Sequence, residues 1–451
     1  LKRCPIIVLR RVGRGRAALR RCIGVLPEAA MPTVHPTEYA RRMTGPEARY
    51  LDDTLQDRQG AARPDTGTRP GVAGFFRVLG GNLFLSSLLL CIPFGFVTHF
   101  TDQPDWLVFI ANFFAILPMA WLIGKSTEDL SAHTGEALGA LLNATFGNVV
   151  EMLLCVAGIR RNEISIVQCT LVGSILSNML LVMGTSFLWG GYNNPPPKKM
   201  TYSKVGAGAQ STLMLVGVLG IMLPTIYAFM MPEGQEILDI SRGCSTLLLL
   251  TYVQYLVFSL KTHRDAFEGG GEDSDSDKDG DDDEDARDMD ACTSTVVLAC
   301  CTVMTAFCSE YLIGSIGGAI DRWHVSKEFI GIIVLPIIGN AAEHYTAIVV
   351  AGQNKMDLSL GVAVGSSCQM ALMVTPFTVL AGWVLDRPMS LDFHPFQVTV
   401  LLLAVLIVAN VLKDGESNWL EGSMLVTAYC AIGLIYYCEN GEGTSGLQGL
   451  A

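Results

Sequence analysis

Apolar residues fall into long runs separated by short polar segments. Each run is close to the ~20 residues that a helix needs to cross the hydrocarbon of a bilayer. Only helices can satisfy the backbone groups of such runs in lipid. The pattern therefore predicts an all-α polytopic membrane protein with about 11 transmembrane helices. The runs cover 82–100, 106–124, 136–159, 164–190, 205–231, 243–260, 292–320, 328–351, 358–384, 395–412 and 419–438.

Composition supports a membrane protein and locates the acidity of the chain. Of 451 residues, 50% are hydrophobic and 16% are charged, with a mean hydropathy of +0.39. Soluble domains carry about 25% charged residues. The net charge of −12 arises mainly between Glu268 and Asp290, where 13 acids face two bases. The acidity is thus a property of one segment.

The polar segments divide the chain into parts. The first 26 residues hold eight Lys or Arg and no acid, a composition that transit peptides share. We expect instead a disordered, basic cytosolic arm, with Met31 as an alternative start. Lys and Arg in the short loops, together with the basic arm, favour a cytosolic N-terminus and acidic loop, although Arg160 and Arg161 count against this orientation. The expected parts are the arm 1–81, an extra first helix 82–100, a five-helix repeat 106–260, the acidic loop 261–291, a second five-helix repeat 292–438 and a tail 439–451.

Two similar stretches predict the repeat. Gly147-Asn148-Val149-Val150-Glu151 and Gly339-Asn340-Ala341-Ala342-Glu343 both read GNxxE. Gly173-Ser174 and Gly365-Ser366 each follow 22 residues after the glutamate, so both elements recur at an offset of 192 residues. An odd number of helices per repeat forces the two copies to cross in opposite directions. Such inverted repeats are typical of secondary transporters with a site at the membrane midplane.

The repeated acids have the chemistry of a cation site. Glu151 lies nine residues before Arg160, or about 13 Å along a helix, which is near mid-membrane. An acid there is costly unless it is protonated, paired or bound to a cation. Asn148 and Asn340 share a helix face with their glutamates, and Gly147 and Gly339 permit close approach or local unwinding. These oxygen ligands suit calcium, with manganese as an alternative.

Two carboxylates roughly neutralise one divalent ion, and protons are the natural replacement when the ion leaves. This exchange predicts a calcium–proton antiporter in which ion and protons compete for the same oxygens. Further residues are predicted to support transport. Glu128, at the end of its run, is expected either at the membrane interface or in gating or ion entry, whereas Glu310 lies deeper, eleven residues before Asp321, and a functional role is favoured for it. His344 could relay protons, and Ser174, Ser177, Ser366 and Gln369 could line the site, with helix packing as the alternative for each.

These motifs resemble those of the calcium/proton exchangers of the CAX type, within the cation/calcium exchanger superfamily. The resemblance covers about 82–440 and rests on LNATFGNVVEMLL, LPIIGNAAEHYTAI, GSILSN, GSSCQMAL and the acidic loop. It implies eleven helices with the first outside the repeat, a vacuolar or other endomembrane location, and loading of calcium into an acidic lumen. It also implies that Glu151, Glu343, Asn148 and Asn340 bind the metal. Ser126 departs from the family pattern, and the arm before residue 70 has no recognised match.

Other functions are weighed against this one. A sodium-driven calcium exchanger and a manganese/proton antiporter remain alternatives within the superfamily, and a cation channel is a weaker one. An enzyme would need a nucleophile–base pair or an HExxH metal motif, and the sequence contains neither. We expect no cofactor and no nucleic-acid partner, and we leave a homo-oligomer open. Asp275-x-Asp277-x-Asp279-Gly280 copies half of an EF-hand, but Ala286 replaces the required glutamate, which leaves a linker or a cation-gathering element.

Overall fold

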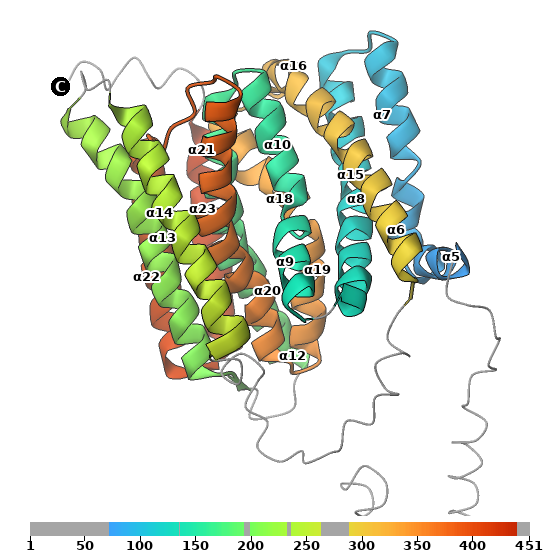
Figure 1. The fold of residues 1–451 in the computed structure, drawn as a ribbon. Coiled ribbons are helices and arrows are strands. Elements are labelled where there is room, and N and C mark those ends of the chain that lie inside the picture. The colour runs from blue at the N-terminus through green and yellow to red at the C-terminus, as the bar shows by residue number, and fades with distance from the viewer. Residues whose placement is uncertain (1–71, 135, 194–198, 232–235, 263–287, 440–451) are drawn as a thin grey trace, which may run out of the picture. The chain divides into compact units, whose positions relative to one another are not determined.

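The computed structural model describes residues 72–134, 136–193, 199–231, 236–262 and 288–439. These residues belong to one unit, Pro70–Ala451, and form a helical bundle (Figure 1). Among them, nine helical stretches are long and apolar enough to cross a membrane. They are α6–α7 (Leu83–Leu88, Cys91–Phe100), α8 (Asp105–Thr134), α11–η2–α12 (Ile164–Leu176, Ser177–Val182, Met183–Asn193), α13 (Lys204–Met230), α14–η3 (Ile237–Val257, Phe258–Thr262), α15 (Ala291–Gly314), α20–η6–α21 (Met356–Gln369, Met370–Val374, Thr375–Val384), α22–η7 (Pro395–Val411, Leu412–Asp414) and α23 (Trp419–Cys438).

The two GNxxE stretches account for the remaining expected spans. The segment α17–η5–α18 (Lys327–Phe329, Ile330–Val334, Leu335–Gly339) and α19 (Ala341–Gly352) form a pair bent by 60°, which makes a tenth span when it is counted as one. Helices α9 (Glu136–Phe146) and α10 (Val149–Arg160) fill the run expected at 136–159, but each is short. The prediction of an all-α polytopic membrane protein is confirmed, and the count of eleven helices is not.

Both GNxxE stretches interrupt a helix at the same place in the motif. Gly147 and Asn148 separate α9 from α10, and Asn340 separates α18 from α19. In Figure 1, α10 lies above α9 whereas α19 lies below α18, so the two broken segments run in opposite directions. Inverted copies of one unit would have this arrangement.

Two π-helical segments also occur at matching positions. Segment η2 starts at Ser177, three residues after Ser174, and η6 starts at Met370, four residues after Ser366. Each lies within a long helical stretch whose residues are mostly buried in the bundle. Single π-helical turns inside α-helices occur frequently at functional sites. The local helix geometry therefore indicates that these two stretches, like the GNxxE motifs, are candidates for a functional site.

Close helix packing brings the two halves of the chain together. At Gly173 of α11, an added Cβ atom would lie 2.4 Å from the carbonyl oxygen of Ile332 and 2.7 Å from Cγ of Pro336. Only glycine permits this approach, and small residues at helix contacts are typical of membrane proteins. The contact holds α11 against η5 and against α18, which ends at Gly339 of the second GNxxE stretch.

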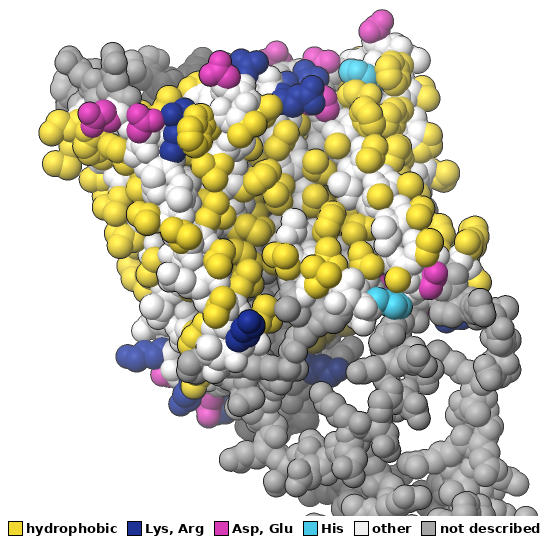
Figure 2. All heavy atoms as spheres, viewed as in Figure 1, with side chains coloured by type: hydrophobic (Ala, Val, Ile, Leu, Met, Phe, Trp, Pro, Cys, Tyr) yellow, Lys and Arg dark blue, Asp and Glu magenta, His cyan; other side chains and the backbone are white. Residues whose placement is uncertain are grey.

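The outer surface is apolar between two charged ends. Leu219, Leu247, Leu250 and Leu403 are all more than half exposed. Figure 2 shows hydrophobic side chains over most of the height of one face, with charged side chains mainly near its two ends. Apolar surfaces of this extent are rare on water-soluble monomers, so this surface is suited to contact with lipid.

Short elements complete the described part of the chain. Strands β1 (Met200–Thr201) and β2 (Glu416–Ser417) pair antiparallel and tie the α12–α13 connection to the α22–α23 connection. Helix α16 (Ile316–Trp323) follows α15. Helix α5 (Val72–Gly81) corrects the expectation of an irregular arm through residue 81, because its Val78 packs with Leu122 and Met289. The predictions for residues 1–71 and for most of the acidic loop, 263–287, fall outside the described residues.

Candidate functional site

Glu151 lies in the first turn of α10, directly after the break at Gly147 and Asn148. Its side chain is buried, with 1% of the residue exposed. The N-terminus of a helix carries a partial positive charge that favours an acid in the first turn. The Oε2 atom of Glu151 nevertheless has no hydrogen-bond partner in the described structure. One oxygen of this buried acid is thus available to a ligand.

Glu343 occupies the equivalent place in the first turn of α19 and has more partners. Its Oε2 accepts a hydrogen bond of 2.9 Å from Nδ2 of Asn178, and its Oε1 accepts one of 2.6 Å from the Ser366 hydroxyl. The same Nδ2 of Asn178 lies 3.0 Å from Oγ of Ser366. Glu343 is only partly buried. Side chains from η2 and α20 therefore fix its position.

The structure brings Glu151 against the segment that precedes Glu343. A Cβ atom added at Gly339, which ends α18, would lie 2.6 Å from Oε1 of Glu151. Glu151 therefore packs directly against the second GNxxE stretch, four residues before Glu343 in the chain. The sequence placed these acids at equivalent positions of two segments, and the structure brings those segments together.

The two asparagines are held so that their carbonyl oxygens stay free. Asn148 donates through Nδ2 to the carbonyl oxygen of Ala144 at 3.1 Å and to Oε1 of Gln369 at 2.5 Å. Asn340 donates through Nδ2 to the carbonyl oxygen of Ser174 at 3.2 Å. The Oδ1 atoms of both asparagines are buried without a partner. Each amide thus connects the two halves and presents an oxygen.

The unpaired oxygens suit a hard cation. Calcium takes six to eight oxygen ligands, which can be carboxylates, amide carbonyls and other neutral oxygens. The described residues contain no group of three or more His, Cys, Asp or Glu that could hold a metal. A cation at this site would thus be bound by two acids together with neutral oxygens. Buried oxygens without a partner on the two GNxxE stretches and on α11 and η2 include Oε2 of Glu151, Oδ1 of Asn148, Asn178 and Asn340, and Oγ of Ser174 and Ser177.

Glu128 and Glu310 lie apart from the two central acids. The side chain of Glu128 is 74% exposed and lies 3.6 Å from Nζ of Lys125. Glu310, which the sequence suggested to be deeper, lies beside the arginines at the end of α10 instead. Its Oε1 is 3.0 Å from Nε of Arg161, and its Oε2 is 3.8 Å from Nη1 of Arg160. Both acids are thus ion-paired and make no described contact with Glu151 or Glu343.

The other predicted residues are distributed as follows. Ser174, Ser177, Ser366 and Gln369 lie on the helices that pack around the acids, and Ser366 and Gln369 bond to Glu343 and Asn148. His344 follows Glu343 on α19 and is partly exposed, and its backbone N–H donates to the carbonyl oxygen of Asn340 at 2.9 Å. This bond fixes the backbone of His344, and a role of its side chain in proton relay stays a prediction.

Asn178 is the residue that the sequence prediction missed. It lies inside the GSILSN motif, next to the predicted Ser177, and it is fully buried. An offset of 192 residues pairs it with Met370, so the repeat gave no second polar residue to draw attention to it. The signal that could have identified Asn178 is its polar amide side chain within an otherwise apolar run.

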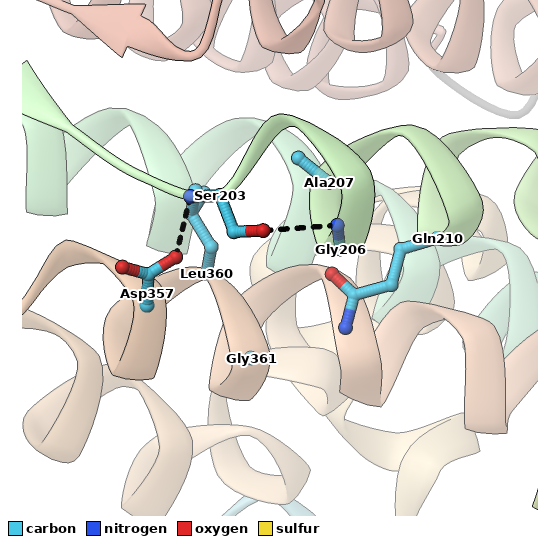
Figure 3. Close-up of a pocket in the computed structure, with 7 residues that line it drawn as sticks. All are labelled: Ser203, Gly206, Ala207, Gln210, Asp357, Leu360 and Gly361. Atoms are coloured by element: carbon cyan, nitrogen blue, oxygen red, sulfur yellow. Dashed lines mark hydrogen bonds between the residues drawn. The ribbon is translucent and has the colours of Figure 1, made fainter. Parts of the chain in front are cut away.

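A small cavity lies near, but outside, this cluster. It has a volume of about 60 Å³ and lies between the N-terminal ends of α13 and α20. Figure 3 shows Asp357 accepting a hydrogen bond from the backbone N–H of Ser203, at 2.7 Å, with the Gln210 amide further along the cavity. Nζ of Lys199 pairs with Glu416 near the same end, and this hydrogen bond lowers the pKa of the Glu416 carboxyl. The cavity contains neither of the central acids.

Comparison with known proteins agrees with this architecture. Residues 104–261 and 293–437 match the profile of a family described as sodium/calcium exchanger protein. The chain belongs to this family. The two matched segments leave out residues 262–292, which include all but the first residue of the acidic loop. The exchanger thus matches its family on both sides of that loop.

Curated relatives cover most of the exchanger. It is 38% identical over 361 residues to vacuolar cation/proton exchanger 3 of Oryza sativa subsp. japonica, covering 79% of this chain and 86% of the relative. It is 35% identical to a vacuolar calcium ion transporter of Schizosaccharomyces pombe (81% and 87% covered). It is 39% identical to a Ca²⁺/H⁺ antiporter of Aphanothece halophytica (80% and 98% covered). The resemblance to calcium/proton exchangers is confirmed.

Solved structures have the same fold. The structure of native YfkE matches with a TM-score of 0.67 at 29% identity and covers 79% of this chain and all of the other. A selenium-substituted form, described as a Ca²⁺/H⁺ antiporter protein, matches with a TM-score of 0.66. The H⁺/Ca²⁺ exchanger CAX matches with a TM-score of 0.59 at 12% identity, which shows the fold alone.

Proposed function

We propose that the exchanger is a Ca²⁺/H⁺ antiporter that moves calcium from the cytosol into an acidic lumen by alternating access. One observation carries the proposal. Glu151 lies in one of two oppositely directed broken helices (Figure 1) and packs against the break before Glu343 in the other, where a set of buried oxygens has no partner. The names of the relatives, which are cation/proton exchangers and calcium transporters, support the same substrates.

Charge explains the exchange. Two carboxylates in an apolar bundle are costly when nothing balances them. One calcium ion neutralises both and can be surrounded by the free oxygens of Asn148 and Asn340. When the ion leaves toward the lumen, protons from that compartment can replace it on the carboxylates. Because ion and protons occupy the same oxygens, the site carries one or the other on each passage.

We further propose that the chain consists of two inverted five-helix repeats, 106–260 and 292–438, and that it resides in a vacuolar or other endomembrane. The matching breaks, the matching π-helical segments and the offset of 192 residues support the repeats. The vacuolar relatives support the location. The cytosolic placement of the N-terminus and of the acidic loop is part of the same proposal.

Transport in reconstituted vesicles tests this function. Purified protein in proteoliposomes should take up calcium when the inside is acidic and should release protons in exchange. Collapse of the pH gradient with an ionophore should stop uptake, and replacing it with a sodium gradient should not restore uptake. Manganese competition would measure selectivity. Calcium uptake driven by sodium alone would contradict proton coupling, and uptake that needs no gradient and releases no protons would indicate a channel.

A further inference from the structure

The turn between α10 and α11, residues Arg160–Glu163, is bound by charged groups on three sides. Arg161 pairs with Glu310 of α15, and its guanidinium carbon would lie 2.6 Å from a Cβ atom added at Gly314. Glu163 pairs with Lys327 of α17 at 3.3 Å. Arg387, in the α21–α22 connection, donates to the carbonyl oxygen of Arg160 at 3.4 Å. This end of α10 is therefore fixed to three other elements.

The equivalent turn in the other half lacks these bonds. At an offset of 192 residues, Asn354 matches Asn162, and both have a φ of 61°. The turns therefore have the same backbone conformation at this position. Gln353 and Lys355 stand where the first half has Arg161 and Glu163. Neither forms an ion pair with any part of the chain that the structure describes. The charged contacts are thus specific to the α10–α11 turn.

Helix α10 connects this turn to the candidate site. Glu151 lies at its start and Arg160 at its end, nine residues or about 13 Å apart. Because a helix of this length is stiff, fixing its end also fixes the direction of its first turn. Glu151 is fully buried in this structure, whereas Glu343, on the segment whose turn is not bound by charges, is partly exposed.

We propose that Arg161 and Glu310 are positioning residues that form a latch at the end of α10. The latch holds this end of the bundle closed and keeps Glu151 buried. Opening toward this face requires the pair to separate, so that α15 moves away from α10. The proposal rests on the antiport function above and adds which contact must break. The flat packing of the guanidinium on Gly314 gives the latch one defined geometry, since any larger residue at 314 would displace the arginine.

Calcium affinity measured from each face tests the latch. Arg161→Gln and Glu310→Gln should favour the state that is open at this end. In oriented proteoliposomes, the calcium KM should fall on the face that carries Arg161 and rise on the opposite face, each by about threefold or more. Glu310→Gln also removes the weaker pair with Arg160. The double variant should therefore match Glu310→Gln alone, because that substitution already removes the contact with Arg161. Lys199→Gln, which removes an exposed ion pair elsewhere, is the matched control and should leave both KM values unchanged.

The outcomes separate the latch from simple damage. A rise in KM on both faces, or additive effects in the double variant, would overturn the latch, because a merely structural role predicts these results. Unchanged KM values with normal uptake would overturn it as well and leave the antiport function intact. Absence of proton-driven uptake by the wild-type protein would overturn both proposals. If one single variant does not fold, the calcium KM values of the other variant on the two faces still test the latch. Shifts in opposite directions support it, and any other result overturns it.

Discussion

The two acids of the site occupy equivalent positions but have different neighbours. Glu343 accepts hydrogen bonds from Asn178 and Ser366. Glu151 has an unpaired oxygen. The position equivalent to Asn178 in the second repeat is occupied by Met370, whose side chain cannot donate a hydrogen bond to Glu151. Glu343 is thus held in place before an ion arrives, whereas Glu151 depends more on the ion itself. Substitutions around the two acids should therefore have unequal effects.

Loss of either acid should abolish transport. Glu151→Gln and Glu343→Gln keep the size of the side chain but remove a charge that balances a divalent cation. We expect proton-driven calcium uptake in vesicles to fall to background in both variants. Glu416→Gln removes an exposed acid far along the chain and serves as the control, with uptake close to wild type. Wild-type uptake in both site variants would disprove the assignment of the site.

Asn178 should affect calcium affinity through Glu343. Asn178→Leu removes the donor to Oε2 of Glu343, and a hydrogen bond to a charged group contributes about 1.5–3 kcal/mol. We therefore expect the calcium KM to rise roughly tenfold or more while the protein still folds. Met370→Leu, at the equivalent position of the other repeat, is the matched control. An equal rise in KM in both variants would show general damage to π-helical packing instead.

Helices position the site by being interrupted. The breaks before Val149 and Ala341 place each acid in the first turn of a new helix, where the backbone favours negative charge. The π-helical segments η2 and η6 follow the GS elements on the helices that surround the acids. Glycines then allow these elements to touch, so the position of the acids depends on a few close contacts.

The contact at Gly173 should not tolerate a methyl group. In Gly173→Ala, the new atom would meet the backbone of Ile332 at 2.4 Å. Overpacking of this kind typically costs about 1–3 kcal/mol, and we expect a lower thermal midpoint and reduced uptake. Gly243→Ala is the control, because nothing lies within 4 Å of its added atom. Alanine there should leave the midpoint unchanged or raise it slightly. Equal midpoints in both variants would mean that the α11–η5 contact is not tight.

The ion pair between Lys199 and Glu416 of β2 makes a pH-dependent contribution to the stability of the fold. The Lys199 ammonium lowers the pKa of Glu416 below its usual value. The pair therefore adds stability above about pH 4.3, the ordinary value for glutamate, and loses it as the pH falls through the lowered pKa. The thermal midpoint of Glu416→Gln should lie slightly below that of the wild type at neutral pH. This gap between the two midpoints should disappear in acid. The gap should be small because the pair is exposed. A gap that widens in acid would contradict the assignment.

At the scale of the whole molecule, the site belongs to neither half alone. Asn148 of the first half bonds to Gln369 of the second, Asn340 of the second half bonds to Ser174 of the first, and Asn178 reaches Glu343. Glu151 of the first half likewise packs against Gly339 of the second. Function should therefore require both halves in one assembled bundle.

Separated halves should be inactive. A chain that ends at residue 262 and one that begins at residue 288 each retain one acid and lack the partners from the other half. We expect neither to take up calcium when expressed alone in vesicles depleted of endogenous exchangers. Coexpression should restore uptake in proportion to the complex recovered by copurification. Uptake by a single half would contradict a shared site.

The apolar runs of the chain were enough to predict the fold class and the positions of most spans, and the repeated motif was enough to predict which two acids are equivalent. Apolar run length is read directly along the chain, and a buried charge stands out in such a run. The exact offset between the two GNxxE stretches also predicted their equivalence. Glu310 and Asn178 were less well predicted, because a residue's depth and partners depend on neighbouring helices. The helix at Val72–Gly81 was missed because it is short and is stabilised by packing against distant residues.

How groups from the two halves meet around the acids depends on the tertiary structure. Hydrogen bonds between residues 165 or more positions apart orient Asn148, Asn340 and Glu343, and no local pattern encodes such contacts. It also decided that Glu310 pairs with Arg161, because both lie at helix ends that meet only after the bundle has packed. Local composition sets which segments enter a membrane, whereas the meeting of two segments depends on the packing of every helix between them.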